Sequence, residues 1–331
     1  MKQNTVAFQP HATNLFFHIL TACNLKCRHC YIRKDQHGSR TLSMKNIKSW
    51  LSLFAKKKKT ANVIFLGGEP TLHPELGRAI KTAKAMGYAS VTIDTNGYLF
   101  HDILEKVSPE ELDFLSFSLD GATAPVCDAI RGEGVFEVCT KNARKAAEKG
   151  FSTSLIYTVS EKNIHELEKM PLLLKDLGIS RFFIQVLGMR GNSLQNPGQK
   201  QVNRHTWTSL VPEVAREVAS LGIGVTWPKV FLGPEDSFEC AGLVADNFFV
   251  FPNGRVYRCP LCEDYPIHAF EIKENRLIER PPLHEGQFFE LNIPEGCVMN
   301  RLVQPGNLDY DKDGHPLSRI ACCLLKEEIL P

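Results

Sequence analysis

The chain has 331 residues, with 39 Lys and Arg against 37 Asp and Glu. A chain of this length can bury a substantial core, which suits one large α/β domain with a smaller one. Its near-neutral charge gives no reason to expect nucleic acid or an anionic membrane as a partner. No apolar run is long enough to cross a bilayer and no signal peptide is evident, so we expect a cytoplasmic protein.

The chain contains eleven cysteines, and most of them lie toward its two ends. In a reducing compartment this distribution indicates metal ligation rather than disulfides. Cys127 and Cys139 stand alone in the middle, and we expect them to be small buried apolar side chains. The other nine cysteines define two candidate metal sites.

From Asn14 to about residue 220, short apolar runs alternate with longer amphipathic segments. The predicted strands are residues 15–20, 62–68, 90–97, 114–121, 152–159 and 181–188. The predicted helices between them include residues 71–87, 134–150 and 163–178, each ending in glycine. This alternation predicts an α/β fold with a parallel sheet. Six units are too few for a closed eight-stranded barrel, so residues 1–220 are expected to form a partial (β/α)6 TIM-like barrel or an open sheet, with the chemistry in the loops after the strands.

The loop after the first predicted strand contains Cys23, Cys27 and Cys30, in the spacing C-x3-C-x2-C. Three thiols leave a tetrahedral metal site one ligand short. Zinc could recruit His29 or His18, so the spacing alone leaves zinc as an alternative. An iron–sulfur cluster held by three thiolates would instead offer one iron to a substrate or cofactor. The position after a strand, where parallel-sheet folds place their active sites, favours the cluster.

Three further motifs follow the next three predicted strands. They are LGGEP with Gly67, Gly68 and Glu69, TNG with Thr95 and Asn96, and SLDG with Ser118 and Asp120. Together with the three cysteines, these motifs in this order resemble the radical S-adenosylmethionine (SAM) enzymes over about two-thirds of the chain. The resemblance implies that these residues, and Arg131 in IRGEGVFE, form the SAM pocket. Ser118 and Asp120 could instead cap the next helix.

The resemblance also implies cofactors and a reaction. The three cysteines would hold a [4Fe–4S] cluster whose remaining iron is chelated by the amino and carboxylate groups of SAM. An electron from the reduced cluster would cleave SAM into methionine and a 5′-deoxyadenosyl radical. A reductant such as flavodoxin or ferredoxin is then expected as a partner. The cofactor supplies the difficult step, and the motifs assign no catalytic side chain of the protein.

After residue 221 the helical periodicity ends and turn residues become frequent, so residues 221–331 are expected to form a smaller, cysteine-rich α+β region. FFVFPNGRVYRC predicts a hairpin around Asn253 and Gly254. The region contains Cys240, Cys259, Cys262, Cys297, Cys322 and Cys323. The stretch from Cys240 to Cys259 resembles the start of the Twitch and SPASM extensions of radical SAM enzymes, which bind auxiliary iron–sulfur clusters.

The dense cysteine block of a full SPASM extension is missing here, which implies one auxiliary cluster, of the [4Fe–4S] type. Cys240 and Cys259 are the firmest candidate ligands, and two of the other four cysteines would complete the set. Ligation by three cysteines, with one iron left for substrate, is an alternative. Zinc at the CPLC motif is another.

The substrate class is inferred from the lengths of the two regions. The first strand begins near Asn14, which leaves no room before it for a peptide-recognition module, and the auxiliary region is short. We therefore expect hydrogen abstraction from a small metabolite or cofactor precursor. Modification of a peptide or protein by a SPASM-type maturase is the second hypothesis, and a non-catalytic iron–sulfur or zinc scaffold is the third.

Overall fold

The computed structural model describes residues 3–6, 12–55, 60–196, 198–233, 235–293, 297–302, 307, 310–315, 317 and 319–331. Within these residues, 13 strands form one sheet in the order β1-β13-β8-β7-β6-β5-β4-β3-β2-β9-β10-β11-β12. The strands are β1 (Gln3–Val6), β2 (Ala12–His18), β3 (Thr60–Leu66), β4 (Ser90–Thr95), β5 (Phe114–Ser118), β6 (Thr153–Val159), β7 (Arg181–Val186), β8 (Gly224–Pro228), β9 (Asp246–Val250), β10 (Arg255–Tyr257), β11 (Phe270–Lys273), β12 (Arg276–Glu279) and β13 (Lys326–Ile329).

Helices connect most of these strands. The α-helices are α1 (Lys34–His37), α2 (Met44–Ala55), α3 (Leu76–Ala85), α4 (Ile103–Lys106), α5 (Ala124–Arg131), α6 (Val135–Glu148), α7 (Met170–Asp176), α8 (Asn192–Gln195), α9 (Arg204–Ser220), α10 (Ala241–Val244), α11 (Glu285–Glu290) and α12 (Val298–Leu302). Short 3₁₀ segments span Pro70–Leu72, Ile164–Lys169 and Pro260–Asp264. None of the helices in the described ranges is long and apolar enough to cross a membrane.

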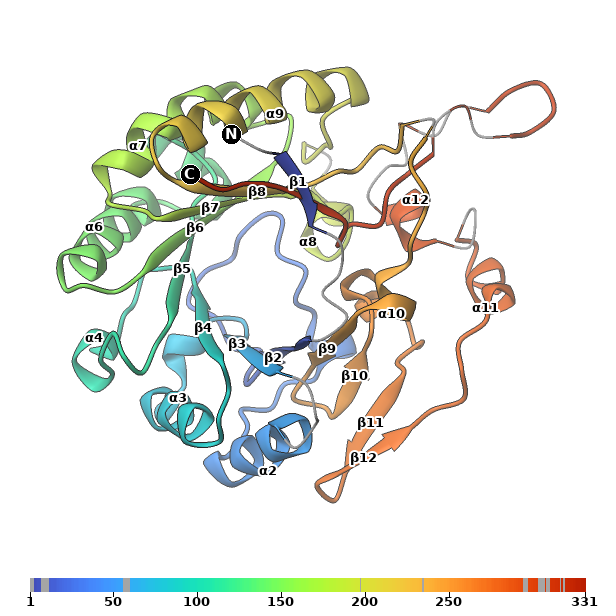
Figure 1. The fold of residues 1–331 in the computed structure, drawn as a ribbon. Helices are drawn as coiled ribbons and strands as arrows, with labels where there is room; N and C mark the ends of the chain where they lie inside the picture. Colours follow the sequence, from blue (N-terminus) through green and yellow to red (C-terminus); the bar gives the residue numbers. More distant parts are fainter. Residues whose placement is uncertain are drawn as a thin grey trace.

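The six predicted strands correspond to β2–β7, and their parallel pairing is confirmed. β8 adds a further parallel strand after residue 220, and β9 pairs in parallel with β2 at the other side. The sheet therefore continues past the expected boundary at residues 220 and 221. It curves into a partial barrel with helices on its convex side (Figure 1). The predicted α/β class and partial barrel are confirmed.

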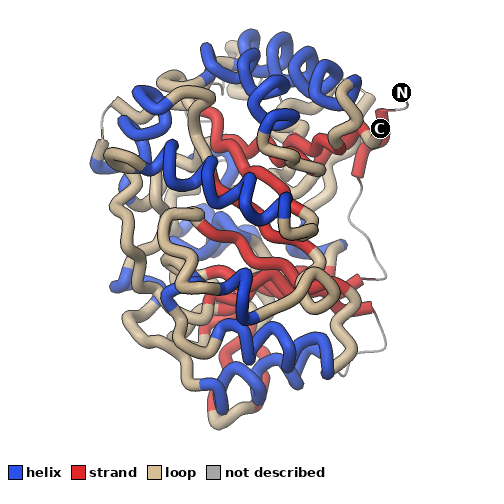
Figure 2. The backbone as a smooth tube through the Cα atoms, turned by 90° about the vertical axis from the view of Figure 1, so that its left-hand side faces the viewer, coloured by secondary structure: helices blue, strands red, loops and turns tan. Residues whose placement is uncertain are grey.

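Alternate residues of each strand face either the helices or the concave side of the sheet. On the convex side, Phe17 of β2 packs on Trp50 of α2 with ring centroids 6.1 Å apart, and both are buried. On the concave side, the guanidinium of Arg181 on β7 lies 5.4 Å from the ring centroid of Phe114 on β5. The same guanidinium pairs with Glu328 on β13 at 3.3 Å. The apolar core thus lies between strands and helices, and the side view shows the helices lying outside the strands (Figure 2).

The C-terminal region consists of short elements around the predicted hairpin, which is confirmed. β9 and β10 pair antiparallel, and Gly254 between them has a φ of 89°. After β12, the chain returns to the opposite edge of the sheet, where β13 pairs antiparallel with β8 and β1. Cys127 and Cys139 are buried in the core, as predicted.

Candidate active site

The loop between β2 and α1 carries the first cysteine set at the carboxyl ends of the parallel strands. Cys23 is exposed, Cys27 and Cys30 are half-buried, and all three are free thiols. Within the loop, the Cys30 amide donates to the Cys27 carbonyl oxygen at 3.2 Å. The Arg28 amide donates to the carbonyl oxygen of Ile130, in α5, at 2.9 Å. The loop is therefore positioned by segments that are distant in the sequence.

Gly67 and Gly68 allow the loop after β3 to lie directly against the cysteine loop. The Gly68 amide donates to the Leu20 carbonyl oxygen at 3.0 Å, and the Glu69 amide to that of Ala22 at 2.9 Å. A Cβ at Gly68 would lie 2.3 Å from the Ala22 oxygen, and one at Gly67 would lie 2.8 Å from the Leu20 oxygen. The two glycines are thus required for contact between two protein loops, whatever contact they also make with SAM.

The side chain of Glu69 is completely buried and connects neighbouring loops. Its Oε1 accepts from the Thr95 hydroxyl and its Oε2 from the Asn96 amide, each at 2.7 Å. Burial raises the pKa of Glu69, while these hydrogen bonds favour the ionised form. Asn96 Nδ2 donates to Asn24 Oδ1 at 2.9 Å and lies 3.7 Å from Cys23 Sγ. The side chains of Glu69 and Thr95 therefore bind each other, and the side chain of Asn96 contacts the cysteine loop.

Asp120 and Arg131 form a buried ion pair next to the cysteine loop. Arg131 Nη2 lies 2.6 Å and His29 Nε2 3.2 Å from Asp120 Oδ2. Asp120 Oδ1 accepts from the Thr158 amide at 2.7 Å, so the carboxylate is used in these contacts rather than in a helix cap. Ser118 is half-buried at the end of β5. The structure thus brings the residues of the SLDG motif and Arg131 together with the loop of the three cysteines.

The residues around the first cysteine set fit a metal cluster with an additional polar ligand. Three buried nitrogen atoms, Asn24 Nδ2, His29 Nδ1 and Arg131 Nε, have no hydrogen-bond partner in the described part of the chain. Such buried atoms are costly unless a bound group satisfies them. Burial raises the pKa of all three cysteines, to about 12 for Cys27, so iron must displace their protons. Three soft thiolates form a donor set that suits an iron–sulfur cluster.

The sequence analysis missed a segment that holds this loop from another side. After β7, the Asn192 amide donates to the Cys30 carbonyl oxygen and Asn192 Nδ2 to that of Cys27, both at 2.9 Å. Gly191 has a φ of 55°, and a Cβ there would lie 2.4 Å from the Cys30 oxygen. The sequence did offer one signal for this segment. Gly191 and Asn192 come soon after the sixth predicted strand, at the same edge of the sheet as the other motifs.

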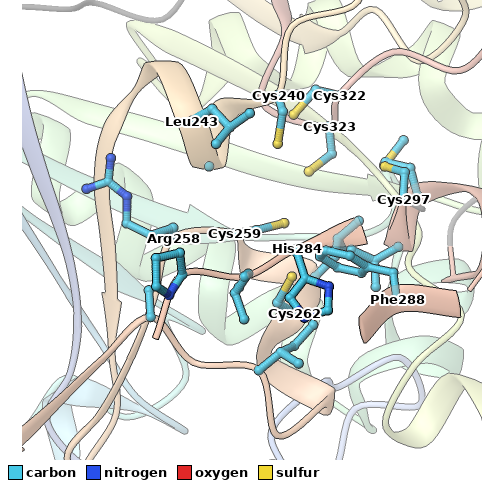
Figure 3. Close-up of a pocket in the computed structure, with 18 of the residues that line it drawn as sticks. Cys240, Leu243, Arg258, Cys259, Cys262, His284, Phe288, Cys297, Cys322 and Cys323 are labelled. Carbon is cyan, nitrogen blue, oxygen red and sulfur yellow. The ribbon is translucent and has the colours of Figure 1, made fainter. Parts of the chain in front are cut away.

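The six C-terminal cysteines line one cavity of about 740 Å³. Figure 3 shows Cys240, Cys322 and Cys323 on one side of this space and Cys259 and Cys262 on the other. They come from different elements: the start of α10, the segment before β13, and the 3₁₀ segment after β10. Cys297, before α12, also lines the cavity. The structure therefore brings together all six residues that were candidates for the auxiliary site.

The C-terminal thiols interact in pairs. The hydrogen bond between Cys259 and Cys262 lowers the pKa of Cys259 and raises that of Cys262. The bond between Cys322 and Cys323 lowers the pKa of Cys322 to about 6. Over the described ranges, no three His, Cys, Asp or Glu side chains are placed to hold one metal ion.

Arg190 connects the two cysteine regions. Its Nη1 donates to the Pro260 carbonyl oxygen at 2.6 Å and lies 3.1 Å from Glu263 Oε2. Its guanidinium carbon lies 4.5 Å from the ring centroid of Tyr31, the residue after Cys30. Burial raises the pKa of Glu263 to about 8, against the effect of Arg190. The segment that holds the first cysteine loop therefore also holds the segment of Cys259 and Cys262.

Comparison with known proteins adds independent support for this interpretation. Residues 18–174 match the family model of the radical SAM superfamily. The chain is 27% identical over 209 residues to pre-heme d1 synthase of Dinoroseobacter shibae, covering 62% of this chain and 51% of that protein. It is 28% identical over 299 residues to mycofactocin maturase MftC of Mycolicibacterium smegmatis, covering 86% and 73%. SuiB of Streptococcus suis has a similar fold, with a TM-score of 0.61 at 15% identity, covering 78% and 62%.

These matches cover part of this chain and part of each relative. The chain spans about half the length of several curated relatives, 51% to 53%. The family match contains the three cysteines and all four stretches of the predicted SAM pocket, from Gly67 to Arg131. The resemblance seen in the sequence is thus confirmed over residues 18–174, which match the radical SAM superfamily, whose members use a [4Fe–4S] cluster and S-adenosylmethionine.

Proposed function

We propose that the protein cleaves SAM reductively at a [4Fe–4S] cluster and abstracts hydrogen from a small metabolite or cofactor precursor. The observation that carries this proposal is the convergence of the loops after β3, β4 and β5 and of the Gly191–Asn192 segment around the loop of Cys23, Cys27 and Cys30. When bound, the reduced cluster supplies the electron that converts SAM into methionine and a 5′-deoxyadenosyl radical. A small electron-transfer protein such as flavodoxin or ferredoxin is the proposed reductant.

The protein's own residues would position these groups. The three thiolates would ligate the cluster. The backbone amides of Gly68, Glu69 and Asn192 donate hydrogen bonds to carbonyl groups of the cysteine loop and its approach from β2, and so fix the path of that loop. The buried nitrogen atoms of His29 and Arg131 would donate to polar groups of SAM. Asp120 would hold both side chains in place.

The six C-terminal cysteines would hold one auxiliary [4Fe–4S] cluster in their shared cavity. Cys240 and Cys259, on opposite sides of that space, are the first choice as ligands (Figure 3). Two of Cys262, Cys297, Cys322 and Cys323 would complete the set. Since the cavity continues along apolar residues such as Phe288 and Met299, the cluster would be shielded from water on that side.

A peptide substrate is the second candidate. The match to MftC, a maturase, covers more of both proteins than the match to pre-heme d1 synthase. SuiB, whose fold is similar, has been solved bound to the precursor peptide SuiA. The names of other relatives, such as GTP 3′,8-cyclase, favour a small molecule. Turnover of isotope-labelled SAM with candidate metabolites and peptides would distinguish the two, because label transfer identifies the substrate.

Metal analysis tests the two cluster sites. After anaerobic reconstitution we expect about eight iron atoms per chain, and about four in a Cys23→Ala/Cys27→Ala/Cys30→Ala variant, because each [4Fe–4S] cluster carries four. Cys139→Ala, outside both sets, should retain the parental iron content. Equal iron in the triple variant and the parent would contradict the first site. About four irons with stoichiometric zinc in the parent would replace the auxiliary cluster with a zinc site.

A further inference from the structure

The outer surface of the cysteine loop carries two exposed cations, Lys26 and Arg28, one on each side of Cys27. Over the described ranges of the chain, neither side chain forms an ion pair. The cations that act on the thiols of this loop are instead Arg131 and Arg190, which are largely buried. Lys26 and Arg28 are therefore free to contact a second molecule.

The backbone at Arg28 is held on both sides. Its amide donates to the Ile130 carbonyl oxygen at 2.9 Å, and Asn196 Nδ2 donates to its own carbonyl oxygen at 3.2 Å. Leu194 lies in α8, between Asn192 and Asn196, which both bind the cysteine loop, and its side chain is 60% exposed. The loop thus presents two cations beside an exposed apolar side chain, and a partner would pay little entropy to order this surface.

Two further lysines lie along the segment after Asn196. A Cβ at Gly198 would lie 2.9 Å from Lys162 Nζ, and Lys200 is exposed. Glu161 is an exposed carboxylate beside them, and its amide donates to the Lys200 carbonyl oxygen at 3.0 Å. The positive charge of this surface is therefore concentrated at the cysteine loop itself.

We infer that this surface is the docking site of a protein electron donor with a carboxylate-rich face. This inference rests on the proposed function. One electron would pass from the donor, which is oxidised, to the first cluster, which is reduced. Cys23 is exposed on the same loop, so a donor bound here would lie close to that cluster. Opposite charges steer a partner to its site, and electron-transfer encounters use small interfaces, which suits a patch of this size.

Rapid mixing of the anaerobically reconstituted full chain with a reduced flavodoxin of net negative charge tests the inference. The readout is the rate of flavodoxin oxidation. We expect Lys26→Gln/Arg28→Gln to lower the second-order rate constant at least tenfold at low salt. This difference should shrink as salt is raised, because steering between exposed charges is screened. Lys26→Arg/Arg28→Lys keeps both charges and should restore most of the rate.

The matched control removes the same charge from another surface. Lys141 and Lys175 are exposed on α6 and α7, which cover the convex side of the sheet, and Lys141→Gln/Lys175→Gln should retain the parental rate (Figure 1). Photoreduced deazaflavin, a small neutral reductant that needs no docking surface, should reduce all variants as fast as the parent. Equal flavodoxin rates in Lys26→Gln/Arg28→Gln and the parent would overturn the inference. An equal loss of rate with both reductants would also overturn it.

A second variant tests whether the donor enters at the C-terminal cysteines instead. Leu243 lines the C-terminal cavity and is 84% exposed. A lower flavodoxin rate in Leu243→Ser, with a parental rate in Lys26→Gln/Arg28→Gln, would place the donor there and overturn the inference.

Calorimetric binding of oxidised flavodoxin to the same variants tests the surface without cluster reduction or SAM cleavage. We expect the affinity to fall in Lys26→Gln/Arg28→Gln most strongly at low salt, and in Leu194→Ser by a factor that does not depend on salt. Parental affinity in both variants would overturn the docking site. Because this titration needs no turnover, failure of the proposed reaction would leave it interpretable.

Discussion

Asp94, on β4, shows how burial of one carboxyl group would make stability depend on pH. Burial raises its pKa from 3.8 to about 7, with a contribution from Glu69, against a hydrogen bond from Ser116. Between about pH 4 and pH 7 the folded chain therefore binds a proton that the unfolded chain has released. The free energy of unfolding must then fall as pH rises through this window.

Asp94→Asn removes this titration and keeps the size of the side chain. We expect the variant to be more stable than the parent at pH 8, by on the order of 1–3 kcal/mol, and this advantage to shrink at pH 5. Urea unfolding at both pH values measures the difference. Asp176→Asn, in an exposed pair with Arg144, is the control and should show little change with pH. A difference that is the same at pH 5 and pH 8 would exclude the elevated pKa.

At the scale of elements, the segment between β7 and α8 depends on a glycine at its closest approach to the cysteine loop. Gly191→Ala would place a Cβ 2.4 Å from the Cys30 carbonyl oxygen at a φ of 55°. We expect the segment to withdraw and the first site to lose iron, while the C-terminal cysteines keep theirs. Gly222→Ala is the matched control, because its φ is 82° but nothing lies within 4 Å. It should cost only about 1 kcal/mol of backbone strain. Iron content and thermal unfolding are measured for both variants. Equal iron content and equal melting temperatures in the two variants would contradict the prediction.

The elements also show what the sequence could and could not predict. β2–β7 were predictable because each is a short apolar run, and all but β6 are followed by a motif or a glycine. β8 was missed because GVTWP is short and ends in proline, and its place is set by β7 and β13 on either side. Gly191 and Asn192 were missed because such a pair is common in ordinary turns. Their contact with Cys30 arises only when the sheet curves and brings β7 near β2.

At the scale of the whole molecule, one continuous sheet positions both cysteine sites. β9 pairs with β2, which leads to Cys23, and with β10, which leads to Cys259. The two sites therefore begin near the ends of strands that are separated by a single strand. Arg190 adds a second connection between them, from the far side of the partial barrel. Two independent connections would keep the sites at a fixed separation, as electron transfer between two clusters requires.

The energetic importance of the second connection can be measured with a double-mutant cycle on the largely buried pair Arg190–Glu263. Arg190→Met removes the partner of Glu263, whose pKa burial already raises to about 8, so the carboxyl group becomes protonated rather than staying charged. We therefore expect a loss of about 1–3 kcal/mol in the free energy of unfolding, the cost of leaving a buried polar group unsatisfied. Arg190→Met/Glu263→Gln replaces both members of the pair and completes the cycle; if the two side chains interact, its destabilisation should be less than the sum of the two single variants. Arg144→Met, which breaks the exposed pair with Asp176, is the control and should cost at most about 1 kcal/mol. Additive effects in the cycle would show that Arg190 and Glu263 act separately, and the connection would then depend on the Pro260 carbonyl and Tyr31 contacts.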